Sequence, residues 1–159
     1  MQWDDLLNTA DDLVSTAGNR RPRQSNLRRA VSTAYYAMFH CLAGCCADTL
    51  VGGRSADRSG PAWRQAYRAL ERGLARNNCK RNDFIAKFPQ DIVDFANAFV
   101  ALQEKRHMAD YDPAVSFVKL EVEGDIAEAR TTIEGFLSVG RKHRRAFAVY
   151  VLFKTRANP

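Results

Sequence analysis

The chain has 159 residues, of which 46% are hydrophobic and 26% charged, a composition typical of a folded globular domain and not of a disordered chain. No apolar run reaches the roughly 20 residues that cross a bilayer, and the first residues are acidic, so we expect no membrane span, no signal peptide and a cytoplasmic location. The formal net charge of +6 leaves open whether the basic residues attract a polyanion or only keep the protein soluble.

Helical periodicity dominates the first third of the chain. Apolar residues at steps of three and four predict an amphipathic first helix that stops near Ala17 and Gly18. Ser25 is the expected N-cap of a second, longer helix that extends to about Leu50. The segment VGGRSADRSGP at 51–61 is rich in glycine and serine, and therefore predicts a loop.

Two further helices are expected in the middle of the chain. The third begins near Pro61 and carries a stripe of aromatic residues and leucines on its buried side. A turn at NNCKRND and an irregular segment at 84–89 separate it from the fourth. Asp91 is the expected N-cap of that fourth helix, which must end by Asp112 because Pro113 disfavours the α conformation in the residue before it.

The last third of the chain predicts a fifth helix at about 114–139 and a final segment open to two interpretations. The β-branched and aromatic residues of AFAVYVLF, at 146–153, fit a strand, but nothing else offers a sheet, so we favour a helix. The prediction is an all-α, antiparallel bundle of about five helices. Residues 1–140 would form the helical domain, and 141–159 a basic and apolar C-terminal extension.

Arginine is concentrated in two segments, NRRPRQSNLRR at 19–29 and GRKHRR at 140–145. A planar guanidinium can bind two phosphate oxygens at once, so such clusters suit a nucleic acid. Arg28, Arg29 and the cluster at 141–145 are therefore candidate contacts to a polyanion such as RNA.

The segment EKRHMADYDP places four chemically versatile side chains at the end of the fourth helix. Arg106 and Asp110 are four residues apart and share a face, while His107 and Tyr111 lie further round the helix. One interpretation is structural, with Arg106 paired to Asp110 and Tyr111 covering the helix end. The other is functional, with these four residues forming a catalytic or binding cluster.

A polar stripe accompanies the apolar face of the second helix. Ser32, Tyr36 and His40 succeed one another at intervals of four, and therefore share one side. A helix that buries only an apolar face does not need these residues at this spacing. We expect a carboxylate on a neighbouring helix as a partner, either in a purely structural network or in a ligand-binding cleft.

Together the two motifs resemble the HEPN superfamily, and more closely its small stand-alone members. LRRAVSTAYYAMFH at 27–40 is similar to the family's R-x-x-x-S-x-A-Y-Y-A-x-F-H helix, and RHMADY at 106–111 to its R-x-x-A-D-Y helix end. The resemblance covers about residues 1–140. It implies a helical bundle that forms a homodimer, in which the fourth-helix motifs of the two subunits face a shared cleft.

Many HEPN proteins are metal-independent ribonucleases, often toxins, with a signature of arginine, a polar residue and a later histidine. Arg106 and His107 match the start of this signature, but Tyr111 stands where the histidine is expected. Cleavage needs a base for the 2′-hydroxyl and an acid for the leaving oxygen. A histidine has a pKa of about 6.5 and suits both tasks, whereas a tyrosine has a pKa of about 10 and does not. His107 or His40 would therefore have to take the place of the missing histidine. The sequence leaves enzymatic activity open.

Other chemistries are poorly matched, and we expect no metal and no cofactor. Cys41, Cys45 and His40 would meet around one helical turn, but no second cluster at zinc spacing accompanies them, so cysteines packed in a core are the simpler interpretation. The segment at 51–61 lacks the Gly-Lys-Ser/Thr ending of a phosphate-binding loop. Ser32 has no evident base with an orienting acid, which argues against a hydrolase triad.

The leading hypothesis is a small HEPN-like homodimer that binds RNA or a nucleotide, with weak metal-independent ribonuclease activity of a toxin or defence system kept open. Arg106 would contact phosphate, Asp110 would orient Arg106 or Tyr36, and His107 and Tyr111 would make polar contacts. The alternative is a non-catalytic interaction module that partners a nucleotidyltransferase, an antitoxin or another protein. In that case the polar cluster is structural and the apolar tail docks the partner.

Overall fold

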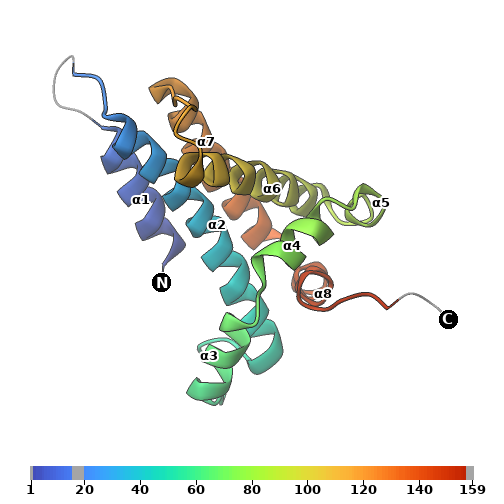
Figure 1. The fold of residues 1–159 in the computed structure, drawn as a ribbon. Helices are drawn as coiled ribbons and strands as arrows, with labels where there is room; N and C mark the ends of the chain where they lie inside the picture. The colour runs from blue at the N-terminus through green and yellow to red at the C-terminus, as the bar shows by residue number, and fades with distance from the viewer. Residues whose placement is uncertain (1, 16–19, 157–159) are drawn as a thin grey trace.

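The computed structural model describes residues 2–15 and 20–156, and within them helices joined by loops are the only regular secondary structure (Figure 1). In chain order the helices are α1 (Trp3–Val14), α2 (Gln24–Val51), α3 (Gly60–Arg68), α4 (Arg72–Cys79), α5 (Asn82–Ile85), α6 (Gln90–Tyr111), α7 (Lys119–Ser138) and α8 (Arg141–Leu152). The predicted all-helical bundle is confirmed, although the described chain has more and shorter helices than expected. None of the helices in these two stretches combines the length and apolarity needed to cross a bilayer.

Helix α2 is the central element of the bundle. It packs against α1, α3, α6, α7 and α8, so that little of its length is free of neighbours. Small residues such as Ala30, Ala34 and Ala37 are fully buried, which lets the surrounding helices approach closely. The polar stripe of α2 meets different helices along its length: Ser32 contacts α6, Tyr36 lies beneath Arg72 of α4, and His40 contacts α3. The fold therefore places the two sequence motifs on packed, adjacent helices.

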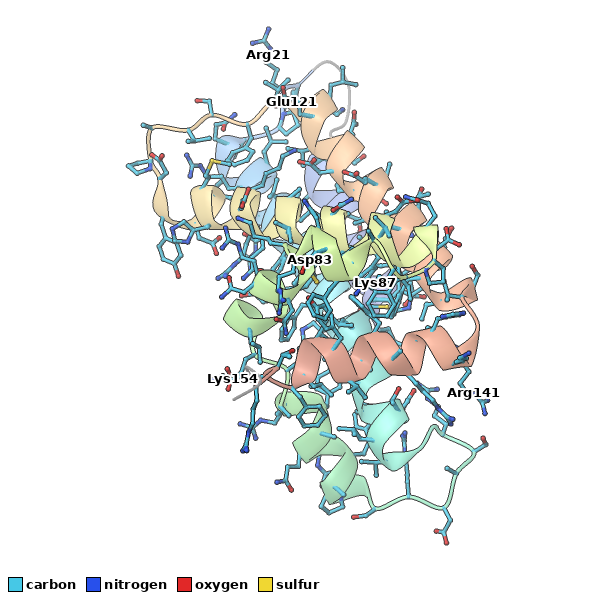
Figure 2. All side chains as sticks on the ribbon, turned by 90° about the vertical axis from the view of Figure 1, so that its right-hand side faces the viewer. Arg21, Asp83, Lys87, Glu121, Arg141 and Lys154 are labelled. Carbon is cyan, nitrogen blue, oxygen red and sulfur yellow. The ribbon has the colours of Figure 1, made fainter. Side chains whose placement is uncertain are left out.

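An aromatic cluster holds α6, α7 and α8 together. The rings of Phe95 and Phe136 are stacked with centroids 4.5 Å apart, and Phe147 of α8 lies edge-on to Phe136 at 5.8 Å. All three side chains are fully buried, and aromatic pairs in these geometries add to the stabilisation that burial provides. The final segment is therefore a helix, as favoured from the sequence, and it contributes to the main core. Figure 2 shows α8 from the side, with Arg141 at its start.

Two helix starts differ from the prediction. Helix α2 begins after Arg23, not at a Ser25 cap, because Gln24 is already fixed by the loop before α7: its Nε2 donates to the Phe117 carbonyl and its Oε1 accepts from the Phe117 N–H, both at 2.8 Å. Helix α6 begins after Pro89, not at Asp91, since the Pro89 carbonyl accepts the first helical hydrogen bond from Ile92 at 2.9 Å. The predicted end of the first helix at Ala17 and Gly18 lies outside the described residues, and α1 ends at Val14.

The expected third and fifth helices are also altered. The third is divided, because Glu71 is extended and separates α3, which packs on α2, from α4, which packs on α6 and α8. The predicted turn at 77–83 is partly helical, since α4 extends to Cys79, and the short α5 begins in this turn and ends in the expected irregular segment at 84–89. The fifth helix starts at Lys119, about one turn later than predicted, because Asp112 accepts a hydrogen bond from the Ala114 N–H at 2.9 Å and holds this segment as a loop.

Candidate functional site at the α2–α6 contact

Asp110 connects the two motifs. Its Oδ1 accepts a hydrogen bond of 2.7 Å from the Ser32 hydroxyl of α2, and its Oδ2 lies 2.9 Å from Arg106 Nε one turn earlier on α6. The Arg106 N–H does not point along this second contact, so it is an ion pair without hydrogen-bond geometry. The carboxylate expected from a neighbouring helix is thus Asp110, and its partners are Ser32 and Arg106. Tyr36, the other expected partner, is not hydrogen-bonded to it.

Arg106 lies over two adjacent tyrosine rings of α2. Its guanidinium carbon is 5.3 Å from the Tyr36 ring centroid and 5.8 Å from that of Tyr35, both within the range of a cation–π attraction. Only 15% of the Arg106 side chain is exposed, yet no other described residue is hydrogen-bonded to its Nη groups. Carboxylate and rings therefore fix the guanidinium, while its two Nη groups keep their hydrogen-bonding capacity.

Tyr35 is the buried member of the tyrosine pair. Its side chain is fully buried, and its hydroxyl has no hydrogen-bond partner in the described part of the chain. Burial raises the pKa of Tyr35 to about 12, against the opposing effect of the Arg72 and Arg106 charges. The phenol is consequently protonated at neutral pH, and it is a donor that lacks an acceptor.

Arg28 lies at the end of α6. Its Nη1 donates to the carbonyls of Ala109 at 2.8 Å and Asp112 at 3.0 Å, and its Nη2 donates to the Val115 carbonyl. The Ala109 and Asp112 carbonyls are groups that the end of a helix leaves without intrahelical donors, and Val115 belongs to the loop that follows, so Arg28 serves as a C-terminal cap from another helix. Its neighbour Arg29 is exposed. A shallow hollow of about 520 Å³ lies beside Arg28, lined by Gln24, Asp110, Tyr111, Pro113 and Ser116 among others.

His40, His107 and Tyr111 are not gathered around Asp110. His40 shares a hydrogen bond with the Tyr67 hydroxyl of α3, and the two rings are stacked at 5.8 Å. Burial, with a smaller effect of the Arg72 charge, lowers the pKa of His40. His107 and Tyr111 are exposed and contact each other with ring centroids 5.0 Å apart. His40 and His107 are therefore held in different surroundings, on α2 and at the outer side of α6.

Two residues near Arg106 were not among the sequence candidates. Arg72, the first residue of α4, places its guanidinium carbon 5.3 Å from the Tyr36 ring and 5.5 Å from the Phe39 ring. Gln103 of α6 donates weakly to the Arg72 carbonyl at 3.4 Å. Spacing could have indicated Gln103, which precedes Arg106 by three residues and shares its face. No local signal indicates Arg72, because its position depends on the break between α3 and α4.

The two arginine-rich segments do not merge. Figure 2 shows Arg21, before α2, and Arg141, at the start of α8, at widely separated edges of the molecule. In the second cluster, Arg144 Nε donates to the Val139 carbonyl at 2.9 Å, so part of its capacity serves the α7–α8 connection. The positive charge near Arg106 is consequently supplied from α2, α4 and α6 themselves.

The cysteines are buried and unpaired. Cys41, Cys46 and Cys79 are at most 6% exposed, Cys45 is half-buried, and none forms a disulfide. Burial raises the pKa of all four thiols. In the described stretches, no three His, Cys, Asp or Glu side chains converge as a set of metal ligands.

The chemistry of the α2–α6 contact is that of an anchored cation. A phosphate oxygen is a suitable acceptor for the Nη groups of Arg106, because charge-assisted hydrogen bonds to oxyanions are stronger than neutral ones. Ser32 and Asp110 would hold the guanidinium in place during such binding. Comparisons of the chain with protein-family models, curated proteins and solved structures gave no match.

Proposed function

We propose that the chain is a HEPN-like protein that binds single-stranded RNA, with Arg106 as the principal phosphate contact. The observation that carries the proposal is the environment of Arg106: its guanidinium is anchored by Asp110 and two tyrosine rings, and its Nη groups have no acceptor among the described residues. Anchoring lowers the entropy lost on binding, since the side chain is already ordered. The net charge of +6 adds attraction for a polyanion.

The roles of the neighbouring residues follow from their positions. Asp110 is the positioning residue for Arg106, and Ser32 positions Asp110. His107 and Tyr111 are exposed on the outer side of α6, where they make polar and stacking contacts to the RNA. Arg29 extends the positive surface along α2. No metal and no cofactor takes part in binding of this kind.

A second copy of the chain is the partner that suits the end of α6. Met108, Tyr111, Val118 and Leu120 are large apolar or aromatic side chains near this end, and they are 38%, 67%, 55% and 76% exposed. A homodimer formed there covers them and brings two Arg106 sites to one cleft. The alternative is that a different protein, such as a nucleotidyltransferase or an antitoxin, covers this surface. A purified chain that is monomeric by mass and forms a complex with such a protein would favour this alternative.

Metal-independent cleavage is the second candidate function, and the exposure of His107 favours it. His107 is the exposed histidine next to Arg106, and its imidazole can exchange protons with a bound 2′-hydroxyl. The activity would be weak, because Tyr111 replaces the histidine of the family signature. RNA binding does not require this step.

The test measures binding and cleavage of a labelled single-stranded RNA with excess chelator. The native chain is compared with Arg106→Ala and with Arg130→Ala, which loses an arginine–aspartate pair on another face (Arg130 Nη2 to Asp11 Oδ2, 2.8 Å). We expect Arg106→Ala to bind about tenfold to a hundredfold more weakly, as for loss of a charged hydrogen bond, and Arg130→Ala to bind like the native chain. Absence of RNA binding by the folded native chain would refute the proposal.

A further inference from the structure

Three buried polar atoms without a hydrogen bond belong to residues of α2 and α6. They are Tyr35 Oη, Gln103 Oε1 and Arg106 Nε, and in the described stretches they are the only buried side-chain nitrogen or oxygen atoms that lack a hydrogen bond. Phe99 and Arg106 both contact the Tyr35 ring, at 5.5 and 5.8 Å, and Gln103 lies between them on the same face of α6. Atoms of this kind are few in folded proteins and are usually satisfied by water or a ligand. Arg106 Nε keeps its ion pair with Asp110, so Tyr35 Oη and Gln103 Oε1 are the two buried atoms of this group without a polar partner among the described residues.

Arg72 borders this place from a third helix. Its guanidinium lies over Tyr36 at the same 5.3 Å from the ring centroid as that of Arg106, and its backbone carbonyl receives the Gln103 amide. The charges of Arg72 and Arg106 both oppose the rise in the pKa of Tyr35 that burial causes. Arg72 of α4 lies over Tyr36 and Phe39, and Arg106 of α6 lies over Tyr35 and Tyr36, so the two guanidinium groups share the Tyr36 ring.

Arg72 has no carboxylate partner among the described residues, whereas Arg76 on the same helix has one. One turn further along α4, Arg76 pairs with Glu104 of α6 at 2.8 Å, and Lys80 approaches the same oxygen at 3.5 Å. Within the described chain, no carboxylate lies within ion-pair distance of Arg72, and its side chain makes only the two ring contacts. The α4–α6 contact thus neutralises one arginine and leaves the other available, on the side where Arg106 lies.

We propose that Arg72 is a second phosphate-binding residue, so that an RNA strand held at Arg106 continues across Tyr36 and places its next phosphodiester on Arg72. The inference rests on the RNA binding proposed above and adds a residue from α4 to it. Tyr36 acts as a positioning residue, because both guanidinium groups lie over its half-buried ring.

The test uses Arg72→Gln in the full chain, with Arg68→Gln as the matched control. Arg68 is also exposed, lies four residues earlier at the end of α3, and makes no ring contact or ion pair with any described residue. Both substitutions remove one positive charge, so a difference between them measures a local contact. Because Arg72 is exposed and has no ion pair, we expect the thermal midpoint of Arg72→Gln to remain near that of the native chain.

Binding of a labelled single-stranded RNA is measured over a series of salt concentrations. We expect Arg72→Gln to bind about tenfold more weakly, and the slope of log affinity against log salt to fall by about 0.7, the value for one phosphate contact on a single strand. Arg72→Lys should recover part of the affinity, since it restores the charge without the planar fork. Arg68→Gln should differ from the native chain by less than about twofold.

The outcomes separate this inference from the proposed function. Weak binding by Arg106→Ala together with native-like binding by Arg72→Gln would overturn the role of Arg72 and leave RNA binding at Arg106 intact. Equal weakening by Arg72→Gln and Arg68→Gln would also overturn it, because charge alone would then explain the loss. A folded native chain that binds no RNA would remove both proposals.

Discussion

Arg28 joins the start of α2 to the end of α6 through three carbonyl groups, on Ala109, Asp112 and Val115. Replacement by alanine leaves these acceptors without a donor in a half-buried setting. We expect Arg28→Ala to lower the free energy of unfolding by about 2–3 kcal/mol, the range for loss of hydrogen bonds to a charged group. Urea unfolding followed by circular dichroism measures this change.

The adjacent Arg29→Ala is the control for the Arg28 experiment. Arg29 is exposed, and its backbone carbonyl, which accepts from the Thr33 hydroxyl at 2.7 Å, survives the substitution. A loss below about 0.5 kcal/mol is expected for such a surface change. Equal losses for Arg28→Ala and Arg29→Ala would contradict the capping role of Arg28.

His40 gives the stability of the fold a pH dependence. Burial lowers the pKa of His40, and Arg72 acts in the same direction. The unfolded chain, with an ordinary histidine pKa of about 6.5, therefore takes up the proton before the folded chain does. The stability is fully present above this pH and is lost as the pH falls below it. Thermal midpoints at about pH 7.5 and 5.5 should differ more for the native chain than for His40→Gln.

At the residue scale, helical spacing predicted which side chains share a face but not which ones meet. The i, i+4 relation of Arg106 and Asp110 is an observed ion pair, and the expected carboxylate opposite the α2 stripe is present. Spacing could not predict that Ser32 and His40, which share a side of α2, have different partners. Ser32 contacts Asp110 of α6, whereas His40 contacts Tyr67 of α3. Arg72 was missed since its place depends on tertiary packing.

Helix α8 shows how one element completes the core. Phe147, Ala148 and Val151 are fully buried, and Asn78 of α4 is tied to Tyr150 by two reciprocal hydrogen bonds of 2.8 Å. Burial of Phe147 and of Val151 contributes about 1.5–3 kcal/mol each, which is a large share of a typical domain's stability of about 5–15 kcal/mol.

Ending the chain at Gly140 should therefore abolish cooperative unfolding, because Phe95 and Phe136 lose the ring that covers them. Thermal unfolding by near-ultraviolet circular dichroism, with dye binding to exposed apolar surface, measures this effect. A second chain ending at Lys154 keeps α8 and should unfold like the native protein. Cooperative unfolding of the shorter chain would show that α8 is dispensable for the fold. In that case, a change in the oligomeric mass of the shorter chain would show that α8 forms an interface between subunits.

At the element scale, periodicity located the long helices well and the short ones poorly. The apolar stripes of α2, α6 and α7 span several turns, so their existence could be recognised from the sequence. The separation of α3 from α4 could not, since each is shorter than about three turns and the stripe continues across the break. Cap residues were misplaced where a loop contact, as at Gln24, decided the start instead.

The molecule as a whole is organised around one helix, and this explains why its fold class was easier to predict than its site. The apolar residues of α2 are buried by helices that lie both before and after it in sequence, so the pattern alone required a bundle. The site depends on how three of these helices meet, and a few residues of shift in α4 would remove Arg72 from Tyr36. No local feature of the sequence predicts how α4 is positioned along α2.

The buried cysteines allow the dynamics of this bundle to be measured chemically. A thiolate is the reactive form, and burial raises the pKa of Cys79 to about 12 while its side chain is 1% exposed. We therefore expect alkylation of Cys41, Cys46 and Cys79 only when the helices around them separate, with Cys45 reacting first. Mass spectrometry of the alkylated chain gives the rate for each cysteine. The logarithm of each rate should rise with denaturant concentration, with a slope that increases with the surface exposed in the opening event.

Since Cys41 and Cys46 lie on α2 and Cys79 on α4, each alkylation rate would report the free energy of a different opening event, without any engineered label. Equal rates would mean that the bundle opens as one unit. Faster modification of Cys79 would mean that α4 detaches while the central helix stays covered, and that the cation carried by α4 can leave and return to the tyrosine pair in the native state.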